Sequence, residues 1–566
     1  LHLLSRRQRQ MCIRDRVMKT KKILIIIFGI LTLGLGIVAL KSDDRNFEIS
    51  KQLNIYATLF RDINMLYVDE IKPEDLVTES INAMLNSLDP YTIYYPESQT
   101  EDVKLMTTGE YAGIGAVISK RGEGIIIREP YKDSPADKAG LLPGDIIISI
   151  DGKTIKGKTS SEVSELLRGQ PGKEILIKVK REGFEKPLEK KAIREKIQLP
   201  SVPYYGLITD SIGYIYLNSF TDKAATDVRK AIIDLKNQGA QSLVFDLRGN
   251  SGGLLEQAVE ISNFFLPKGS KILATKGKVK QWDKEYIATK NPIVPDMPLA
   301  VLIDRGTASA AEIVSGAFQD YDRGVLIGER SFGKGLVQTV RDLAYNTKAK
   351  ITTAKYYIPS GRCIQALDYS HRNPDGSVGK VPDSLITAYS TKGGRTVYDG
   401  GGISPDIQIE AENYARITQE LVLRDLCFDF VNSYALQNPE ISSIPNFVIT
   451  DDIYSQFKNY LKERNFSYET ESQRTLEKLI KIAKAEKYYD TAKNQLDSLQ
   501  KDFTHSIDRD MEVFKKEISS FLAEQFMQRY YYLGGIIEYK VLHDKEVKKA
   551  VEILENPAEY QKLLKK

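Results

Sequence analysis

The sequence predicts a multidomain α/β protein built around a layered core in which strands and helices alternate. Three observations lead to this prediction. The chain has 566 residues, too many for one hydrophobic core and suited to two to four domains. Short β-type runs alternate with helical patterns between Ile212 and Glu329. A β-rich stretch with many glycines precedes this alternating region. Helical patterns come before the β-rich stretch and after the alternating region.

The first 40 residues combine an unusual leader with an apolar segment. Residues 1–17 lack an initial Met and hold five arginines and one aspartate, a charge of +4 that equals the net charge of the chain. We interpret them as a non-native leader and expect the natural start at Met18. Residues 18–40 contain a basic "MKTKK" and then 18 uncharged residues, which predicts an uncleaved signal-anchor in the cell membrane, with the bulk of the protein on the extracytoplasmic, periplasmic side. A cleaved signal peptide is the alternative, although no small-x-small site follows.

The remaining composition argues against several kinds of partner and site. Beyond residue 17 positive and negative charges balance, so a nucleic-acid partner is not expected. The three cysteines, Cys12, Cys363 and Cys427, allow at most one disulfide. The four histidines are scattered without the spacing of metal ligands. We therefore expect neither a metal nor another cofactor.

Residues 41–105 follow as a helical region. Apolar residues have helical spacing in "IYATLFRDINMLYV" and "EDLVTESINAMLNSL", and "DPYTIYY" ends the pattern at Pro90. No reactive constellation is visible here. We predict a packing or linker region without a catalytic group.

Residues 106–190 form the β-rich module. Its β-type runs are "GAVISK", "GIIIREP", "DIIISIDG" and "EILIKVKREG", interrupted by one helix for which Thr159 and Glu162 have capping-box spacing. The phrases "YAGIGAVI" and "SPADKAGLLPGDIIISIDGKTI" resemble a PDZ domain of the type found in bacterial proteases. The resemblance implies that backbone N–H groups of Gly113, Ile114 and Gly115 bind the C-terminal carboxylate of a protein tail, with Ile114 lining a pocket for the last side chain. The alternative is a tight turn without a ligand.

Residues 191–410 form the layered core. Strands are predicted in "IGYIYLNSF", "QSLVFDL", "PLAVLID" and "GVLIGE", and helices over residues 223–238, over residues 254–265 and from Ser309 onward. Such sheets usually carry their sites at the carboxyl ends of strands, where "RGNSGG" and "RGTASA" occur. Residues 411–566 are rich in Lys and Glu with helical apolar faces, and we assign them to packing, association or substrate access.

Ser309, in "GTASAAEI", is either the N-cap of a helix or a nucleophile. A serine hydroxyl needs a base to take its proton, and no histidine lies within 60 residues of Ser309. Lys334, between two glycines in "ERSFGKGLVQ", follows a buried-looking strand. A desolvated lysine can lose its charge and act as the base. The sequence therefore favours a Ser/Lys pair over a conventional triad.

An oxyanion hole is also predicted. If Ser309 opens a helix, the N–H of Ala310 is an unpaired donor of the first turn, beside the nucleophile. A second donor would be the N–H of Gly252 or Gly253 in "RGNSGG". The alternative for this loop is a plain turn between a strand and a helix.

Six motifs together resemble one enzyme family. "GTASAAEI", the "FGKG" whose lysine follows Ser309 by 25 residues, Gln338, "DLRGNSGG", "YYIPSGRCIQ" and "GGGISPDI" are similar to the carboxyl-terminal processing, or tail-specific, proteases of serine peptidase family S41. The resemblance spans roughly residues 48–410 and implies a ClpP/crotonase-like protease core with an inserted PDZ domain. It implies that Ser309 is the nucleophile, Lys334 the general base, and Gln338 the residue that orients the lysine. Ala311 departs from the pattern, since many relatives carry Ser there, and we expect this difference to tune activity.

Two rival functions stay open at this point. A PDZ-based binding or scaffold protein with an inactive core would have no need of both Ser309 and Lys334. An acyl-CoA enzyme of the crotonase type would have no use for a PDZ domain or an export signal. We therefore expect a serine endopeptidase that cleaves exported proteins after recognising their C-terminal tails. The sequence leaves open whether it forms a homo-oligomer or needs an activating adaptor.

Overall fold

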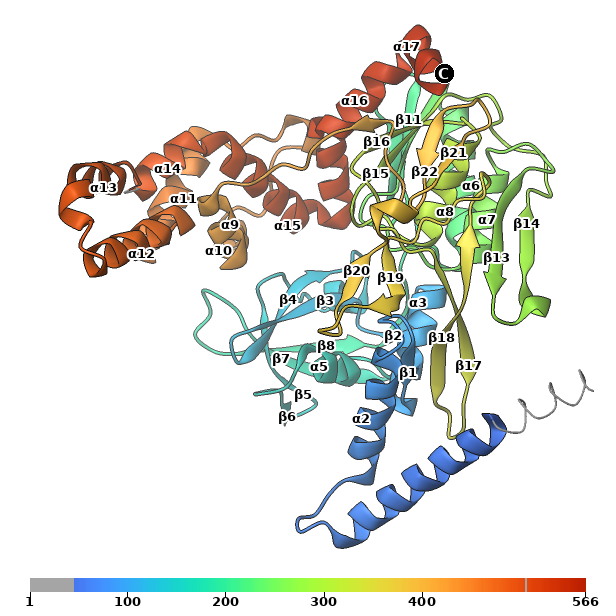
Figure 1. Cartoon of the computed structure of the whole chain (residues 1–566). Helices are drawn as coiled ribbons and strands as arrows, with labels where there is room; N and C mark the ends of the chain where they lie inside the picture. Colours follow the sequence, from blue (N-terminus) through green and yellow to red (C-terminus); the bar gives the residue numbers. More distant parts are fainter. Residues whose placement is uncertain (1–44, 504–505, 566) are drawn as a thin grey trace, which may run out of the picture. The chain divides into compact units, whose positions relative to one another are not determined.

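The computed structural model describes residues 45–503 and 506–565, which divide after Ser87 into two compact units (Figure 1). The first unit contains a helix over residues 45–66 and α2 (Pro73–Asn86). The hydroxyls of Tyr56 and Ser80, 2.5 Å apart, join these two helices. The helical character predicted for this part of the chain is confirmed.

The N-terminal segments are not covered by these ranges. The predicted leader, residues 1–17, and the predicted signal-anchor, residues 18–40, lie outside the described residues. Within the described ranges no helix is long and apolar enough to cross a membrane. The anchor therefore stays a prediction.

A six-stranded sheet forms the β-rich module, in the order β3-β4-β5-β7-β8 with β6 paired to β5. The predicted capping box is present, with Thr159 and Glu162 bonded to each other's backbone N–H groups at the start of α5. Among the described strands β3 pairs only with β4, so its outer edge is open, and α5 contacts β3. The bounds are β3 (Ala116–Arg121), β4 (Gly124–Pro130), α4 (Pro135–Lys138), β5 (Ile146–Ile150), β6 (Lys153–Thr154), α5 (Ser160–Leu167), β7 (Glu174–Lys180) and β8 (Leu188–Ile193), and the flanking β2 (Glu110–Gly113) and β9 (Glu195–Gln198) pair with each other.

A second six-stranded sheet lies at the centre of the layered core. Its order is β10-β11-β12-β15-β16-β23, and all neighbours are parallel except β10 and β11. The four predicted strands are therefore confirmed as central strands of one sheet. The bounds are β10 (Tyr204–Leu207), β11 (Ile212–Tyr216), β12 (Ser242–Asp246), β15 (Leu299–Ile303), β16 (Val325–Gly328) and β23 (Ile407–Gln408).

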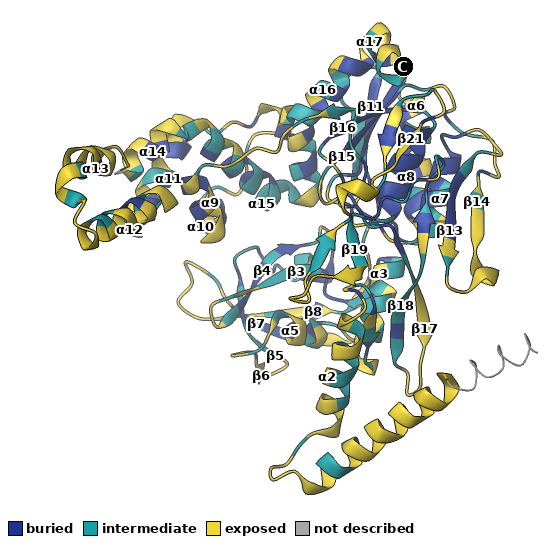
Figure 2. Ribbon diagram, viewed as in Figure 1, coloured by how far each residue is buried: buried dark blue, intermediate teal, exposed yellow. Residues whose placement is uncertain are grey.

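Helices cover both faces of this sheet, as parallel sheets require. Side chains alternate along a strand, and Phe245 and Val301 face the cluster that includes α6 (Ala224–Asn237), α7 (Leu255–Asn263) and α8 (Ala310–Asp320). Their neighbours Val244 and Leu302 face a different cluster, made with the C-terminal α15 (Lys515–His543), α16 (Lys545–Leu554) and α17 (Pro557–Leu564). The end of the chain thus completes the core, and all residues of α8 are buried (Figure 2).

A third sheet joins segments that are distant in sequence. Its order is β1-β18-β13-β14, with β17 also paired to β18. β1 (Ile93–Tyr95) comes from the stretch expected to be an N-terminal helical region, and pairing with β18 makes it part of the core. The other strands of this sheet are β13 (Lys271–Gly277), β14 (Lys284–Ile287), β17 (Leu336–Asp342) and β18 (Lys348–Tyr357). Outside this sheet lie the helix α3 (Thr100–Thr108) and two separate strand pairs, β19 (Leu367–Arg372) with β20 (Val378–Lys380) and β21 (Ala388–Ser390) with β22 (Thr396–Tyr398).

The helices after residue 411 confirm the predicted C-terminal helical region. They share an aromatic core in which the Phe430 ring lies 5.1 Å from Phe457 and 6.4 Å from Phe526. α12 and α13 are mostly exposed (Figure 2). The bounds are α9 (Arg416–Leu423), α10 (Leu426–Gln437), α11 (Asp451–Glu463), α12 (Glu471–Ala485), α13 (Tyr489–Phe503) and α14 (Ile507–Val513).

The long helix α15 is broken once, at Tyr532, whose φ of 59° and ψ of −168° are not helical. The buried carboxylate of Glu129, on β4 of the β-rich module, accepts the Leu533 N–H at 2.8 Å and the Gln528 side-chain amide at 2.9 Å. The Tyr532 hydroxyl donates to Asp137 at 2.9 Å. The Glu129 carboxylate thus binds the Leu533 N–H next to the break, and the three bonds together fix α15 to the β-rich module.

Candidate active site

Ser309 lies between β15 and α8 in a strained backbone conformation. Its φ is 57° and its ψ is −116°, a region that residues with a side chain rarely adopt. Such conformations cost about 1–3 kcal/mol and concentrate at functional sites. The N–H of Ser309 donates to the Glu312 carboxylate at 2.8 Å, and the residue is only partly buried. The strain and the access for solvent fit a nucleophile better than a plain helix cap.

Lys334 lies in the loop between β16 and β17, with its ammonium 4.4 Å from the ring centroid of Tyr91. Burial lowers the pKa of Lys334 to about 8, helped by the nearby charge of Lys350 and opposed by Glu312 and Asp89. About a tenth of the lysine is then a neutral amine at pH 7. A neutral amine is what a general base must be.

Glu312 joins the two loops that carry these residues. Its carboxylate is fully buried and accepts the N–H of Ser309, the N–H of Lys334 at 2.9 Å, the N–H of Gly333 at 2.8 Å and the hydroxyl of Ser331 at 2.6 Å. Burial raises the pKa of Glu312 to about 7, while these four hydrogen bonds lower it. Sequence reasoning missed Glu312, although its position three residues after Ser309 is the capping-box spacing.

Tyr356 makes a second connection between the same loops. Its buried hydroxyl lies 3.1 Å from the carbonyl oxygen of Ser309 and 2.5 Å from that of Lys334, and its one proton serves both. Tyr356 is the first residue of the motif "YYIPSGRCIQ", and the motif alone does not indicate this role. Glu312 and Tyr356 together hold the backbones of Ser309 and Lys334 close to each other.

The segment around Tyr91 contributes to the site although no catalytic group is expected there. Asp89 accepts the N–H groups of Tyr91 and Thr92, both at 2.8 Å, and this turn places the Tyr91 ring against Lys334. A cavity of about 360 Å³ is lined by Asp89 together with Thr352 and Tyr369. This turn packs against a predicted site residue, and the absence of a catalytic group from residues 41–105 stays a prediction.

Gln338, on β17, is held by a neighbouring strand. Its side-chain amide donates to the Thr352 hydroxyl at 3.2 Å. Across the described ranges no hydrogen bond joins Gln338 to Lys334. The role of Gln338 in orienting the lysine therefore stays a prediction.

The glycine loop after β12 lies directly against Ser309. A Cβ on Gly252 would be 2.8 Å from the Ser309 Cβ and 2.9 Å from the Ala310 nitrogen. The Gly252 N–H already donates to the Asn250 side chain at 2.8 Å. The N–H groups of Gly253 and Ala310 have no backbone acceptor among the residues that the structure describes. Of the two glycine donors predicted, Gly253 is thus the one left free to bind a substrate oxygen.

The predicted tail-binding loop follows β2. The N–H groups of Ile114 and Gly115 have no backbone acceptor in the described part of the chain, whereas Gly113 ends β2 and is paired with Glu195. The Ile114 side chain is only 2% exposed and packs in the core of the module, so it does not line a surface pocket as expected. Gly115 has a φ of 75°, and a Cβ there would lie 2.5 Å from Ser134.

Comparison with known proteins identifies the family. The sequence pattern of "Peptidase family S41" matches residues 211–378, that of "PDZ domain" matches residues 126–181, and that of "Probable PDZ-protease, C-terminal helical domain" matches residues 417–554. A "Carboxy-terminal-processing protease" of Bartonella bacilliformis is 37% identical over 353 residues, which cover 61% of this chain and 81% of that protein.

A second relative points the same way. A "Probable CtpA-like serine protease" of Staphylococcus haemolyticus is 34% identical over 407 residues, which cover 69% of this chain and 79% of that protein. The solved structure of a photosystem II D1 C-terminal processing protease is 26% identical and covers 63% of this chain and 88% of that one, with a TM-score of 0.35. The chain therefore belongs to peptidase family S41 and is a serine-type peptidase of the carboxyl-terminal processing kind, with a PDZ domain and a C-terminal helical domain.

Proposed function

We propose that this peptidase cleaves exported proteins with a Ser309/Lys334 dyad after its PDZ domain binds their C-terminal tails. The observation that carries the dyad is that Glu312 and Tyr356 bind the backbones of both residues, while burial lowers the pKa of Lys334 to about 8. A peptidase of this family needs a base for its serine. The two histidines that the structure describes have other partners: His371 bonds Asp368, and His543 bonds the carbonyl oxygen of Tyr539.

The neutral amine of Lys334 takes the proton of the Ser309 hydroxyl as its oxygen attacks the scissile carbonyl carbon. The oxygen of that carbonyl gains negative charge, and the N–H groups of Ala310 and Gly253 stabilise it. Lys334 then passes its proton to the leaving amine, which departs with the C-terminal part of the substrate. Water, deprotonated by Lys334, hydrolyses the ester on Ser309. Gln338 assists by orienting the amine of Lys334.

The tail-binding part of the proposal depends on the PDZ module. The free edge of β3 can accept a peptide as an added strand, since β3 pairs only with β4 in the described sheet. The free N–H groups of Ile114 and Gly115 lie at the start of that edge and can bind a terminal carboxylate.

We further propose that the protein is located at the cell membrane and is held there by residues 18–40. Membrane fractionation with protease accessibility checks this location, and a soluble form that begins after about residue 40 would contradict it.

The dyad is tested by Ser309→Ala, Lys334→Ala and Lys334→Arg. We expect each to abolish cleavage of an unfolded protein substrate without a change in melting temperature, since arginine keeps its proton and cannot act as a base. Ser472→Ala, an exposed serine on α12, is the matched control and should keep full activity. Turnover by Lys334→Arg at neutral pH would reject the lysine as base.

A further inference from the structure

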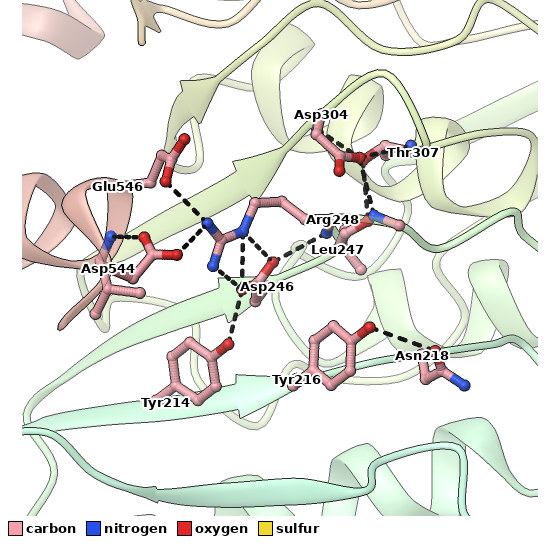
Figure 3. Close-up of polar contacts among 12 residues, drawn as sticks. Tyr214, Tyr216, Asn218, Asp246, Leu247, Arg248, Asp304, Thr307, Asp544 and Glu546 are labelled. Atoms are coloured by element: carbon pink, nitrogen blue, oxygen red, sulfur yellow. Dashed lines mark hydrogen bonds and ion pairs between the residues drawn. The ribbon is translucent and has the colours of Figure 1, made fainter. Parts of the chain in front are cut away.

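Arg248 lies at the start of the glycine loop and is surrounded by three carboxylates (Figure 3). Its Nε and Nη2 bond Asp246, at 3.0 and 2.5 Å, and the buried Asp246 also accepts the Tyr214 hydroxyl at 2.7 Å. Its Nη1 bonds Asp544 at 2.7 Å and Glu546 at 3.0 Å. Asp544, the N-cap of α16, and Glu546, in its first turn, thus bind a residue that lies almost 300 positions earlier in the chain.

This cluster is largely shielded from solvent. The side chains of Arg248, Asp544 and Glu546 are 20%, 17% and 14% exposed. Burial, together with the neighbouring Asp544, raises the pKa of Glu546 to about 7, while Arg248 holds the pKa of Asp544 below its usual range against the effect of burial. Charge-assisted bonds in such a place are stronger and more directional than surface ion pairs.

The C-terminal side of the cluster is rigid. One oxygen of Asp544 accepts the Val547 N–H at 2.9 Å and caps α16, and the other oxygen bonds Arg248. α16 packs on the parallel sheet through Val547, Ala550 and Ile553, all of which are buried. The carboxylates are therefore held by a helix that is itself fixed to the core.

On its other side Arg248 belongs to the glycine loop, which is hydrogen-bonded to the segment before Ser309. The Thr307 hydroxyl donates to the carbonyl oxygen of Leu247 at 2.9 Å, and the Gly249 N–H donates to Asp304 at 2.9 Å. The Ala308 N–H donates to the carbonyl oxygen of Asn250 at 2.9 Å. The segment anchored by Arg248 is thus bonded on either side to the segment that leads into Ser309.

We propose that the C-terminal helix α16 positions the oxyanion-binding loop, through Asp544 and Glu546 acting on Arg248. Arg248, Asp544 and Glu546 are positioning residues: none touches the substrate, and their effect reaches it through Gly252 and Gly253. The C-terminal helical domain is on this account part of the catalytic apparatus. The inference rests on the proposed function, because it assumes that the Gly253 N–H stabilises the developing oxyanion.

The test is the double variant Asp544→Asn/Glu546→Gln in the full chain. Both changes keep the size of the side chain and remove its charge, and asparagine still caps α16. Glu552→Gln on the same helix is the matched control, since Glu552 pairs with Lys549 and not with Arg248. Three quantities are measured for each variant: kcat and KM on an unfolded protein, the pH dependence of kcat/KM, and hydrogen exchange of residues 247–253.

We expect kcat to fall at least about tenfold with KM unchanged, because small displacements of catalytic groups have effects of this size. The limb of the kcat/KM profile that Lys334 sets should keep its midpoint, whereas an inflection near pH 7 that belongs to Glu546 should disappear. Hydrogen exchange of residues 247–253 should become faster. A double variant with the kcat and the exchange rates of Glu552→Gln overturns the inference. A shift in the midpoint of the limb set by Lys334 also overturns it, because the variant would then have altered the dyad.

Glu546→Gln alone decides the question if the double variant does not fold, since it leaves the cap of α16 intact. It should show the same pattern with a smaller loss of kcat. An unchanged kcat together with unchanged hydrogen exchange of residues 247–253 overturns the inference.

The proposed function is judged separately. If wild type and Glu552→Gln are active while Ser309→Ala and Lys334→Arg are inactive, the dyad is supported, whatever the α16 variants do.

Discussion

The charge of Lys350 helps to keep Lys334 neutral, which makes a single residue testable. Lys350 is the second cause of the lowered pKa of Lys334, after burial. Removing a like charge favours the protonated lysine, so Lys350→Gln should raise the pKa of Lys334. Because the base must be neutral, the acidic limb of kcat/KM should shift to higher pH in a profile from about pH 6 to about pH 10.

Lys348→Gln on the same strand is the control for this shift. Lys348 pairs with Asp342, and it does not appear among the charges that act on Lys334. Its midpoint should stay close to that of wild type. An unchanged or lower midpoint in Lys350→Gln would remove Lys334 as the group that limits activity at low pH.

The close contact between Gly252 and Ser309 gives a second prediction. In Gly252→Ala the new Cβ would meet the Ala308 carbonyl oxygen and the Ser309 Cβ, both at 2.8 Å, and the φ of 100° adds strain. We expect a loss of about 100-fold in kcat, from displacement of the nucleophile and the adjacent donors. Gly249→Ala is the control, because Gly249 has a φ of 68° with nothing within 4 Å of the new Cβ. Equal kcat values for the two variants would contradict the prediction.

Some of these residues could be found from sequence and others could not. Ser309, Lys334 and the glycine loop have reactive or conformational properties that a motif displays. Glu312 acts through a buried carboxylate, and Tyr91 acts through a ring face that only the turn at Asp89 aims at the lysine. These roles depend on contacts between distant segments, which local spacing does not contain.

At the level of elements, helices and strands of the core were predictable because their signals are local. Short continuous apolar runs, which are typical of buried parallel strands, predicted β12 and β15, and the capping box at Thr159 predicted the start of α5. The pairing of β1 with β18 and the packing of α16 on the sheet were not predictable. Each joins segments more than 200 residues apart, and the apolar face of α16 could have served any partner.

The packing of α16 yields a prediction about stability. Ile553 is fully buried against the parallel sheet. Ile553→Ala should lower the free energy of unfolding of the core by about 2–4 kcal/mol, since it removes apolar contacts and leaves a cavity. Leu479→Ala, at a 47% exposed site on α12, should change it by less than about 0.5 kcal/mol. Denaturant unfolding of both variants measures this, and similar values would show that α16 is not part of the core.

For the whole molecule, recognition of a substrate's end should control its cleavage. The N–H groups of Ile114 and Gly115 have no backbone acceptor in the described part of the chain, and we propose that they bind the terminal carboxylate of a substrate. An unfolded substrate with a free, apolar C-terminus should therefore be cleaved at least about tenfold faster than the same substrate amidated there, at concentrations below KM. Both substrates contain the same scissile bonds. Equal rates would leave the PDZ domain as a structural module.

The break in α15 at Tyr532 connects two binding events in one thermodynamic cycle. On one side of the break Glu129 of the PDZ domain accepts the Leu533 N–H, and the helix then runs to Asp544. Free energy transmitted along it must be the same in either direction. A bound tail should thus raise the affinity of a peptidyl boronate for Ser309 by the factor by which the boronate raises the affinity for the tail. Glu129→Gln should bring both factors closer to one, and factors that stay at the wild-type value would show that this contact does not transmit the coupling.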